Sequence, residues 1–154
     1  MSFAASRPDP AALPAPVLGV LAALRGGGFE AVLVGGCVRD LLRGRPVADF
    51  DVATAGPPQR VLALFPRAIP IGIRHGTVMI PSGDRPIDVT TFRAGGRLED
   101  DLAHRDFTIN AIAWDPAADR WIDPFDGRAD LAAGRLRAVG SAAAPLAEDP
   151  LRAL

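Results

Sequence analysis

The fold is decided by residues 33 to 54, which read LVGGCVRDLLRGRPVADFDVAT. This stretch begins inside a short apolar run, Ala31 to Val34, that is typical of a buried strand. Gly35 and Gly36 end the run, because a glycine lets the backbone turn and approach a ligand without interference from a Cβ atom. Residues 38 to 42 then predict a helix. A glycine pair alone is also compatible with a plain turn.

A phosphate group is the ligand that this turn fits. The start of the expected helix offers free backbone N–H groups and the positive end of the helix dipole. Arg39 adds a planar guanidinium whose geometry matches phosphate oxygens. We therefore expect Gly35, Gly36 and Arg39 to bind a phosphate group of a nucleotide.

Two aspartates alternate in the strand that we expect over residues 49 to 52. Asp49 and Asp51 should share one face of this strand, while Phe50 and Val52 point into the core. Two neighbouring carboxylates repel each other unless a cation lies between them, and Mg²⁺ prefers a few carboxylates together with substrate phosphates. An isolated Asp-x-Asp can equally be a solvated strand face. The order of strand, glycine turn, helix and acidic strand favours the Mg²⁺ site.

Composition is that of a soluble globular protein. A length of 154 residues is enough for one domain with its own core. Of these residues, 49% are hydrophobic and 23% are charged. The net charge of −1 gives no overall attraction for nucleic acid, so RNA binding would depend on a local patch or on protein outside this sequence. Without a membrane-spanning run or a signal-peptide pattern, we expect a cytoplasmic protein and no membrane partner.

The expected fold is one α/β (α+β) domain built on a mixed β-sheet flanked by helices. Residues 1–16, which contain four prolines, are expected to be a mobile leader, residues 17–144 the main domain, and residues 145–154 the start of a further helix. Helices are predicted over 17–24, 38–42, 59–65 and 98–113, and strands over 31–34, 49–52, 68–73, 77–80, 87–92, 121–123 and 136–139.

The glycine and aspartate stretch resembles the first signature of the bacterial class II tRNA nucleotidyltransferases, the CCA-adding enzymes, and of the related bacterial poly(A) polymerases. Nearly everything from Leu33 onward is covered by this resemblance. Five further segments match in order: HGTV (75–78), IDVTTFR (87–93), LEDDLAHRDFTINAIAWD (98–115), IDPFDGRADLAAGRLRAVG (122–140) and AEDPLRAL (147–154). The resemblance implies the head domain of the nucleotidyltransferase superfamily.

The resemblance also implies a reaction. The 3′ hydroxyl of a tRNA end attacks the α-phosphate of CTP or ATP, and pyrophosphate leaves. Asp49 and Asp51 would hold two Mg²⁺ ions. Asp88 would supply a third carboxylate, at a position where the family often has Glu, and would help to orient or deprotonate the attacking hydroxyl.

Further nucleotide contacts are implied by residues 104 to 110. Arg105 would contact phosphate or sugar, Asp106 the ribose hydroxyl, and Asn110 the region near the triphosphate. The family usually has two arginines before this aspartate, whereas here the first is His104, a weaker phosphate partner at neutral pH. The acidic run 99–101 is expected to be a solvated helix face, and Asp123, Asp126 and Asp130 to be turn and cap residues.

The last matching segment implies base selection. Asp149 would accept a hydrogen bond from the exocyclic amino group of cytosine or adenine, and Arg152 would donate to the adjacent ring nitrogen, so that U and G are rejected. An ion pair between Glu148 and Arg152 at the start of a helix is the structural alternative.

Two alternatives to CCA addition stay open. A poly(A) polymerase would use ATP repeatedly, and the motifs do not separate it from a CCA-adding enzyme. A non-catalytic nucleotide-binding module would act only with a partner chain. In relatives, further helices after the head hold tRNA, so we expect this sequence to be a head fragment whose contacts with tRNA lie mostly outside it.

Overall fold

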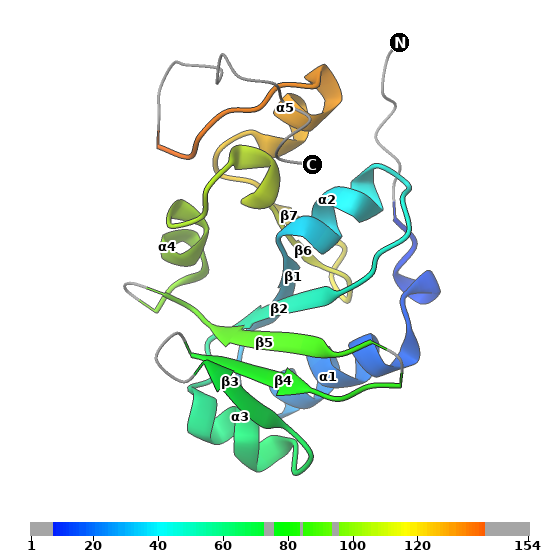
Figure 1. The fold of residues 1–154 in the computed structure, drawn as a ribbon, viewed down its shortest axis with the longest axis vertical. Helices are drawn as coiled ribbons and strands as arrows, with labels where there is room; N and C mark the ends of the chain where they lie inside the picture. The colour runs from blue at the N-terminus through cyan, green and yellow to red at the C-terminus, as the bar shows by residue number, and fades with distance from the viewer. Residues whose placement is uncertain (1–7, 73–75, 84, 94–95, 141–154) are drawn as a thin grey trace.

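The computed structural model describes residues 8–72, 76–83, 85–93 and 96–140 (Figure 1). Seven strands form one sheet in the order β3-β4-β5-β2-β1-β6-β7. The strands are β1 (Ala31–Val34), β2 (Phe50–Thr54), β3 (Ile69–Gly72), β4 (Thr77–Ile80), β5 (Ile87–Thr91), β6 (Ala113–Asp115) and β7 (Arg120–Ile122). The α-helices are α1 (Ala15–Gly26), α2 (Gly36–Leu42), α3 (Pro58–Leu64), α4 (Leu98–Ala103) and α5 (Gly127–Ala133), and two 3₁₀-helices are η1 (Pro10–Ala12) and η3 (Thr108–Asn110).

The sheet is mixed, as the sequence predicts. Strands β2 and β5 pair in parallel, and the other neighbouring strands pair antiparallel. After β2 the chain passes through α3 and the hairpin of β3 and β4 before it enters β5. Two segments that are far apart in the sequence are thereby brought side by side at the centre of the sheet.

Both faces of β1 are covered, which explains why all four of its residues are apolar. Leu33 faces an apolar cluster that contains the buried residues of α1. Val34 faces a second cluster, to which α4 contributes Leu98 and Leu102. In Figure 1, α1 and α3 accordingly lie on one side of the sheet and α4 on the other.

The prediction that residues 98–113 are mostly helical is only partly correct. Helix α4 ends at Ala103, η3 spans only Thr108–Asn110, and Ala113 already belongs to β6, where it pairs with Val34. Residues 136–139 form no regular strand either, and only an isolated bridge joins Phe107 to Ala138. Tertiary pairing decides the local conformation here, because both segments gain partners that are remote in sequence.

Part of the segment expected to be a leader packs on the domain. Residues Pro10–Ala12 form η1, and Leu13 is only 6% exposed within the main apolar cluster. None of the helices formed by the described residues is long and apolar enough to span a membrane.

Candidate active site

Two carboxylates meet on the central parallel strands. Asp51 of β2 is the register partner of Asp88 of β5. Their neighbours Phe50, Val52 and Ile87 are buried in the main apolar cluster, so Asp51 and Asp88 point to the opposite face of the sheet. Asp88 thus lies beside Asp51, where the sequence analysis expects a third carboxylate.

Asp49 is exposed and lies just before the first residue of β2. It is nevertheless within electrostatic reach of the pair, because its negative charge raises the pKa values of both Asp51 and Asp88. The charge of Asp49 thus acts on both carboxylates of the central strands.

Burial and the repulsion from neighbouring carboxylates keep Asp51 and Asp88 from ionising easily. Desolvation is the largest cause that raises the pKa of Asp51 to about 6, followed by the charge of Asp88, whereas the Arg105 guanidinium lowers it. The pKa of Asp88 is raised mainly by burial and then by Asp49. A cation placed between these carboxylates would relieve the repulsion.

The donor set fits Mg²⁺ bound together with a ligand. Within the ranges that the structure describes, no three His, Cys, Asp or Glu side chains form a complete metal site on their own. Mg²⁺ does not require such a cage, since one or two carboxylates plus substrate phosphates and water satisfy it. Asp49, Asp51 and Asp88 therefore fit the ion only as part of a ternary site.

The glycine turn lies against the same carboxylates. Gly35 has a φ of +77° at the junction of β1 and α2, a conformation that other residues rarely adopt. A Cβ atom built on Gly35 would lie 3.2 Å from Nη1 of Arg105 and 3.7 Å from Oδ2 of Asp51. The predicted turn, Asp51 and Arg105 therefore meet in one place.

A hydrogen-bonded chain connects α2 with η3. Nη1 of Arg39 donates to Oδ1 of Asn110 at 2.7 Å, and Nδ2 of Asn110 donates to Oδ1 of Asp106 at 3.1 Å. The same Asp106 oxygen accepts a hydrogen bond from the backbone N–H of Phe107. Three residues that the sequence analysis assigned to nucleotide binding thus form one network.

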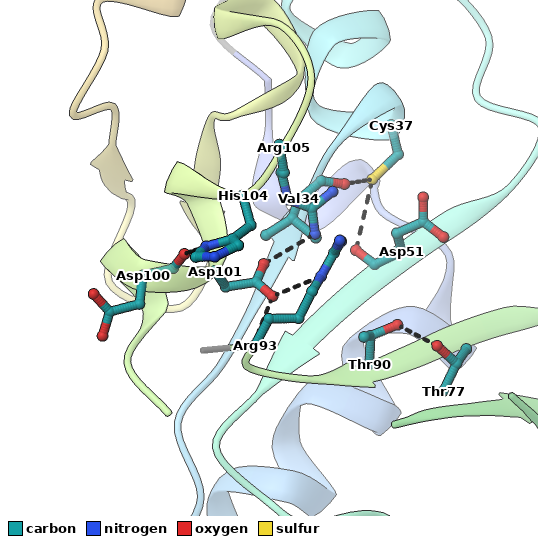
Figure 2. A network of polar contacts seen from close by, with 10 residues as sticks. All are labelled: Val34, Cys37, Asp51, Thr77, Thr90, Arg93, Asp100, Asp101, His104 and Arg105. Atoms are coloured by element: carbon teal, nitrogen blue, oxygen red, sulfur yellow. Dashed lines mark hydrogen bonds and ion pairs between the residues drawn. The ribbon is translucent and has the colours of Figure 1, made fainter. Parts of the chain in front are cut away.

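A second network lies beside α4 (Figure 2). The exposed helix face expected over residues 99–101 is wrong for Asp101, which is fully buried. Its Oδ2 accepts a hydrogen bond from Nη2 of Arg105 at 3.2 Å, and its Oδ1 accepts one from the backbone N–H of Arg93 at 3.0 Å. His104 is exposed, and its ring nitrogen Nδ1 lies 2.8 Å from the carbonyl oxygen of Asp100.

Cys37 is buried and has a packing role. Its thiol lies 3.1 Å from the carbonyl oxygen of Val34, and burial raises its pKa to about 12. A thiol that stays protonated is a poor nucleophile.

Sequence reasoning missed the burial of Asp101 and Asp130 and the ion pair that Arg93 forms with Asp101. Asp130 was expected to be a turn or cap residue, but it is 2% exposed and accepts hydrogen bonds from Thr108 at 2.6 Å and from Arg137 at 3.0 Å. The acidic run offered no signal that its third member points inward. By contrast, Asp123 caps α5 as expected, because its carboxylate accepts from the backbone N–H of Gly127 at 2.7 Å. Asp149, Arg152 and the segment expected to begin a further helix lie outside the described residues.

The glycine turn and facing carboxylates on a mixed sheet define a head domain of the nucleotidyltransferase superfamily, and comparison with known proteins agrees. Residues 31–137 match the family model described as "Poly A polymerase head domain", and the chain belongs to this family.

Its relatives include a CCA-adding enzyme of Geobacillus thermodenitrificans, 43% identical over 150 residues that cover 88% of this chain and 37% of the relative. The crystal structure of the Bacillus stearothermophilus CCA-adding enzyme in complex with CTP superposes with a TM-score of 0.76 at 43% identity, covering 83% of this chain and 34% of that one. A tRNA nucleotidyltransferase complexed with a primer tRNA and an incoming ATP analog gives a TM-score of 0.68 at 30% identity, covering 78% and 38%. This chain therefore spans little more than a third of the length of these relatives.

Proposed function

We propose that the chain is the head domain of a template-independent RNA nucleotidyltransferase that adds C and A to tRNA 3′ ends from CTP and ATP and releases pyrophosphate. The observation that carries the proposal is the meeting of Asp51, Asp88, Gly35 and Arg105 on one face of the sheet. Two solved relatives are described as complexes, one with CTP and one with a primer tRNA and an ATP analog, and these descriptions support the choice of substrates. Residues 17–144 would form the head and residues 145–154 the start of the neck helix, in a cytoplasmic enzyme.

Each side chain then has a role that follows from its chemistry. Asp49 and Asp51 would hold Mg²⁺, with Asp88 as the third carboxylate beside them. When bound, Mg²⁺ supplies a Lewis acid that lowers the pKa of the attacking 3′ hydroxyl and neutralises the leaving phosphates. The Gly35 backbone can approach the triphosphate closely because it carries no Cβ atom.

Arginines and their partners would hold the rest of the nucleotide. Arg105, only 15% exposed, places a guanidinium beside Gly35, where a phosphate would be shielded from water. Arg39 would contact phosphate from a position fixed by Asn110, and Asp106 would accept a hydrogen bond from the ribose hydroxyl. Asp149 and Arg152 would read the base edge.

The test is extension of a tRNA that lacks its CCA end, with CTP, ATP and Mg²⁺. We expect Asp51→Asn to abolish incorporation, because one carboxylate less leaves the metal without its central ligand. Glu30→Gln is the matched control, since Glu30 is 46% exposed and pairs with Arg120 at 3.7 Å on the edge strand β7. Retained incorporation by Asp51→Asn would overturn the metal assignment.

Product length separates CCA addition from the second candidate. The family model that matches this chain is described as a poly(A) polymerase head domain. This description makes a poly(A) polymerase, which adds ATP repeatedly, the second candidate. Extension by three nucleotides supports CCA addition, and a long homopolymer made from ATP alone supports a poly(A) polymerase. Binding of Mg²⁺–CTP without any product supports a nucleotide-binding module that needs a partner chain.

A further inference from the structure

Asp101 is a buried carboxylate that holds two arginines at once. Its side chain is 1% exposed, and its two oxygens lie 3.2 Å from Nη2 of Arg105 and 3.3 Å from Nε of Arg93. Figure 2 shows both guanidinium groups converging on this carboxylate from different elements of the chain. Arg93 follows the end of β5, and Arg105 follows α4.

Relative to Asp101 alone, the two arginines carry an excess positive charge, and the charge of Arg105 also lowers the pKa of Asp51. In the part of the chain that the structure describes, Asp101 is the ion-pair partner of both, so one negative charge is shared between two positive ones. Nε of Arg105 is buried and has no hydrogen-bond partner among the described residues, and the Arg93 side chain is 46% exposed. The pair is therefore short of acceptors and open to solvent on the Arg93 side.

The pair lies on the acidic face of the sheet. Leu98 and Leu102 of α4 pack in the cluster that contains Ala53, which lies two residues after Asp51 on β2 and hence on the same face of that strand. Nη1 of Arg105 reaches the Gly35 turn, where a Cβ atom would lie 3.2 Å from it. An anion bound at this turn would contact Arg105 directly. Arg93 would lie beside Arg105, because both arginines pair with the carboxylate of Asp101.

We propose that Arg93 and Arg105 together bind the triphosphate of the incoming nucleotide, and that Asp101 is the positioning residue that holds both guanidinium groups. The proposal rests on the proposed function for the identity of the anion. Two planar guanidinium groups side by side present several donors to neighbouring phosphate groups, which a nucleoside monophosphate cannot engage in the same way.

The test measures binding of Mg²⁺–ATP, AMP and a single-stranded oligo(A) RNA by titration calorimetry. We expect Arg93→Gln to weaken Mg²⁺–ATP binding by about tenfold, the usual scale for a lost charge-assisted hydrogen bond, and to leave AMP binding unchanged. Asp101→Asn should weaken Mg²⁺–ATP binding at least as much, because neither arginine is then held. The double variant that combines Arg93→Gln with Asp101→Asn should lose less Mg²⁺–ATP affinity than the product of the two single losses, because both substitutions disturb the same contact.

Arg120→Gln is the matched control, because Arg120 is 57% exposed on the edge strand β7 and changes the net charge equally. Arg93→Gln should keep the melting temperature of the parent chain, since the side chain is half-exposed. If Asp101→Asn does not fold, Arg93→Gln and Arg93→Lys decide the matter. Lysine keeps the charge but not the planar fork, so an intermediate affinity is expected.

Each other outcome is decisive. Equal affinities of Arg93→Gln and Arg120→Gln for Mg²⁺–ATP would overturn the proposal. The proposal would also be overturned if Arg93→Gln lost oligo(A) binding but kept Mg²⁺–ATP binding, because Arg93 would then be an RNA contact. If Arg93→Gln loses affinity but the parent chain extends no primer, the two-arginine site stands and the proposed reaction falls. If the parent chain binds no Mg²⁺–ATP, both fall.

Discussion

Asp51 and Asp88 face each other across the parallel strands β2 and β5, each one residue after the start of its strand. The buried faces of these strands are apolar, so the two carboxylates are held by the packing on the other side of the sheet. Their closeness costs free energy in the absence of a cation, and this cost should be measurable.

The pH dependence of stability should report the strain at Asp51. Its pKa rises from 3.8 to about 6 on folding, so the native chain holds this proton more tightly than the unfolded chain. The stability contributed by the protonated form is complete below pH about 4 and is lost as the pH rises through about 6. We expect Asp51→Asn to be more stable than the parent chain by about 1–2 kcal/mol at pH 7.5, and this advantage to vanish at pH 4.

Thermal unfolding in the presence of EDTA measures this difference. The comparison between the two chains cancels the titration of the carboxylates that do not interact with Asp51. An equal melting temperature at pH 7.5 would show that Asp51 ionises without strain.

Magnesium should stabilise the parent chain selectively. A ligand that binds only the native state raises its stability by RT ln(1 + [L]/Kd), so Mg²⁺ with ATP should raise the melting temperature of the parent chain and of Glu30→Gln. Asp51→Asn and Asp88→Asn should show a much smaller rise. A rise of the same size in all four chains would place the metal elsewhere.

Gly35→Ala should impair ligand binding more than folding. The substitution introduces strain at a φ of +77° and places a methyl group 3.2 Å from Nη1 of Arg105. Gly134→Ala is the matched control, because its φ is +66° and no atom lies within 4 Å of the added Cβ. Gly134 lies in the left-handed helical region, so Gly134→Ala should lose roughly 1–2 kcal/mol of stability. Gly35, with a ψ of −145°, lies outside that region, so Gly35→Ala should lose about 1–3 kcal/mol. Only Gly35→Ala should lose affinity for Mg²⁺–ATP in titration calorimetry. Equal affinities of Gly35→Ala and Gly134→Ala would show that the glycine turn is not part of the nucleotide site.

Gly127→Ala should be severely destabilising. A Cβ atom at this position would lie 2.0 Å from the carbonyl oxygen of Thr108, so α5 could no longer pack against η3. We expect a loss of about 3 kcal/mol or more in denaturant unfolding. Gly19→Ala in α1 meets nothing within 4 Å and should instead stabilise the chain by about 0.5–1 kcal/mol. A mild effect at Gly127 would mean that α5 shifts easily.

The glycine turn, the strand position of Asp51 and most strands could be predicted because their signals are local, whereas Asp49 lies just before β2 and not in the strand expected over residues 49–52. The apolar run 31–34 and the positions of Asp51 and Asp88 follow from strand periodicity, and the structure pairs them as expected. The burial of Asp101 could not be predicted, because it depends on Arg93 and Arg105, which reach it through the tertiary fold. The wrong helix after Ala103 has the same cause, since residues 107 and 113 pair with distant backbone.

The parallel alignment of β2 and β5 has a consequence for mutations far from any charge. Side chains alternate along a strand, so slippage of β5 by a single position would turn Asp88 toward α1 and α3 and present Val89 in its place. The apolar contacts of Ile87 and Val89 are what forbid that slippage. Substitutions of Ile87 or Val89 should therefore reduce the activity of the site before they unfold the chain.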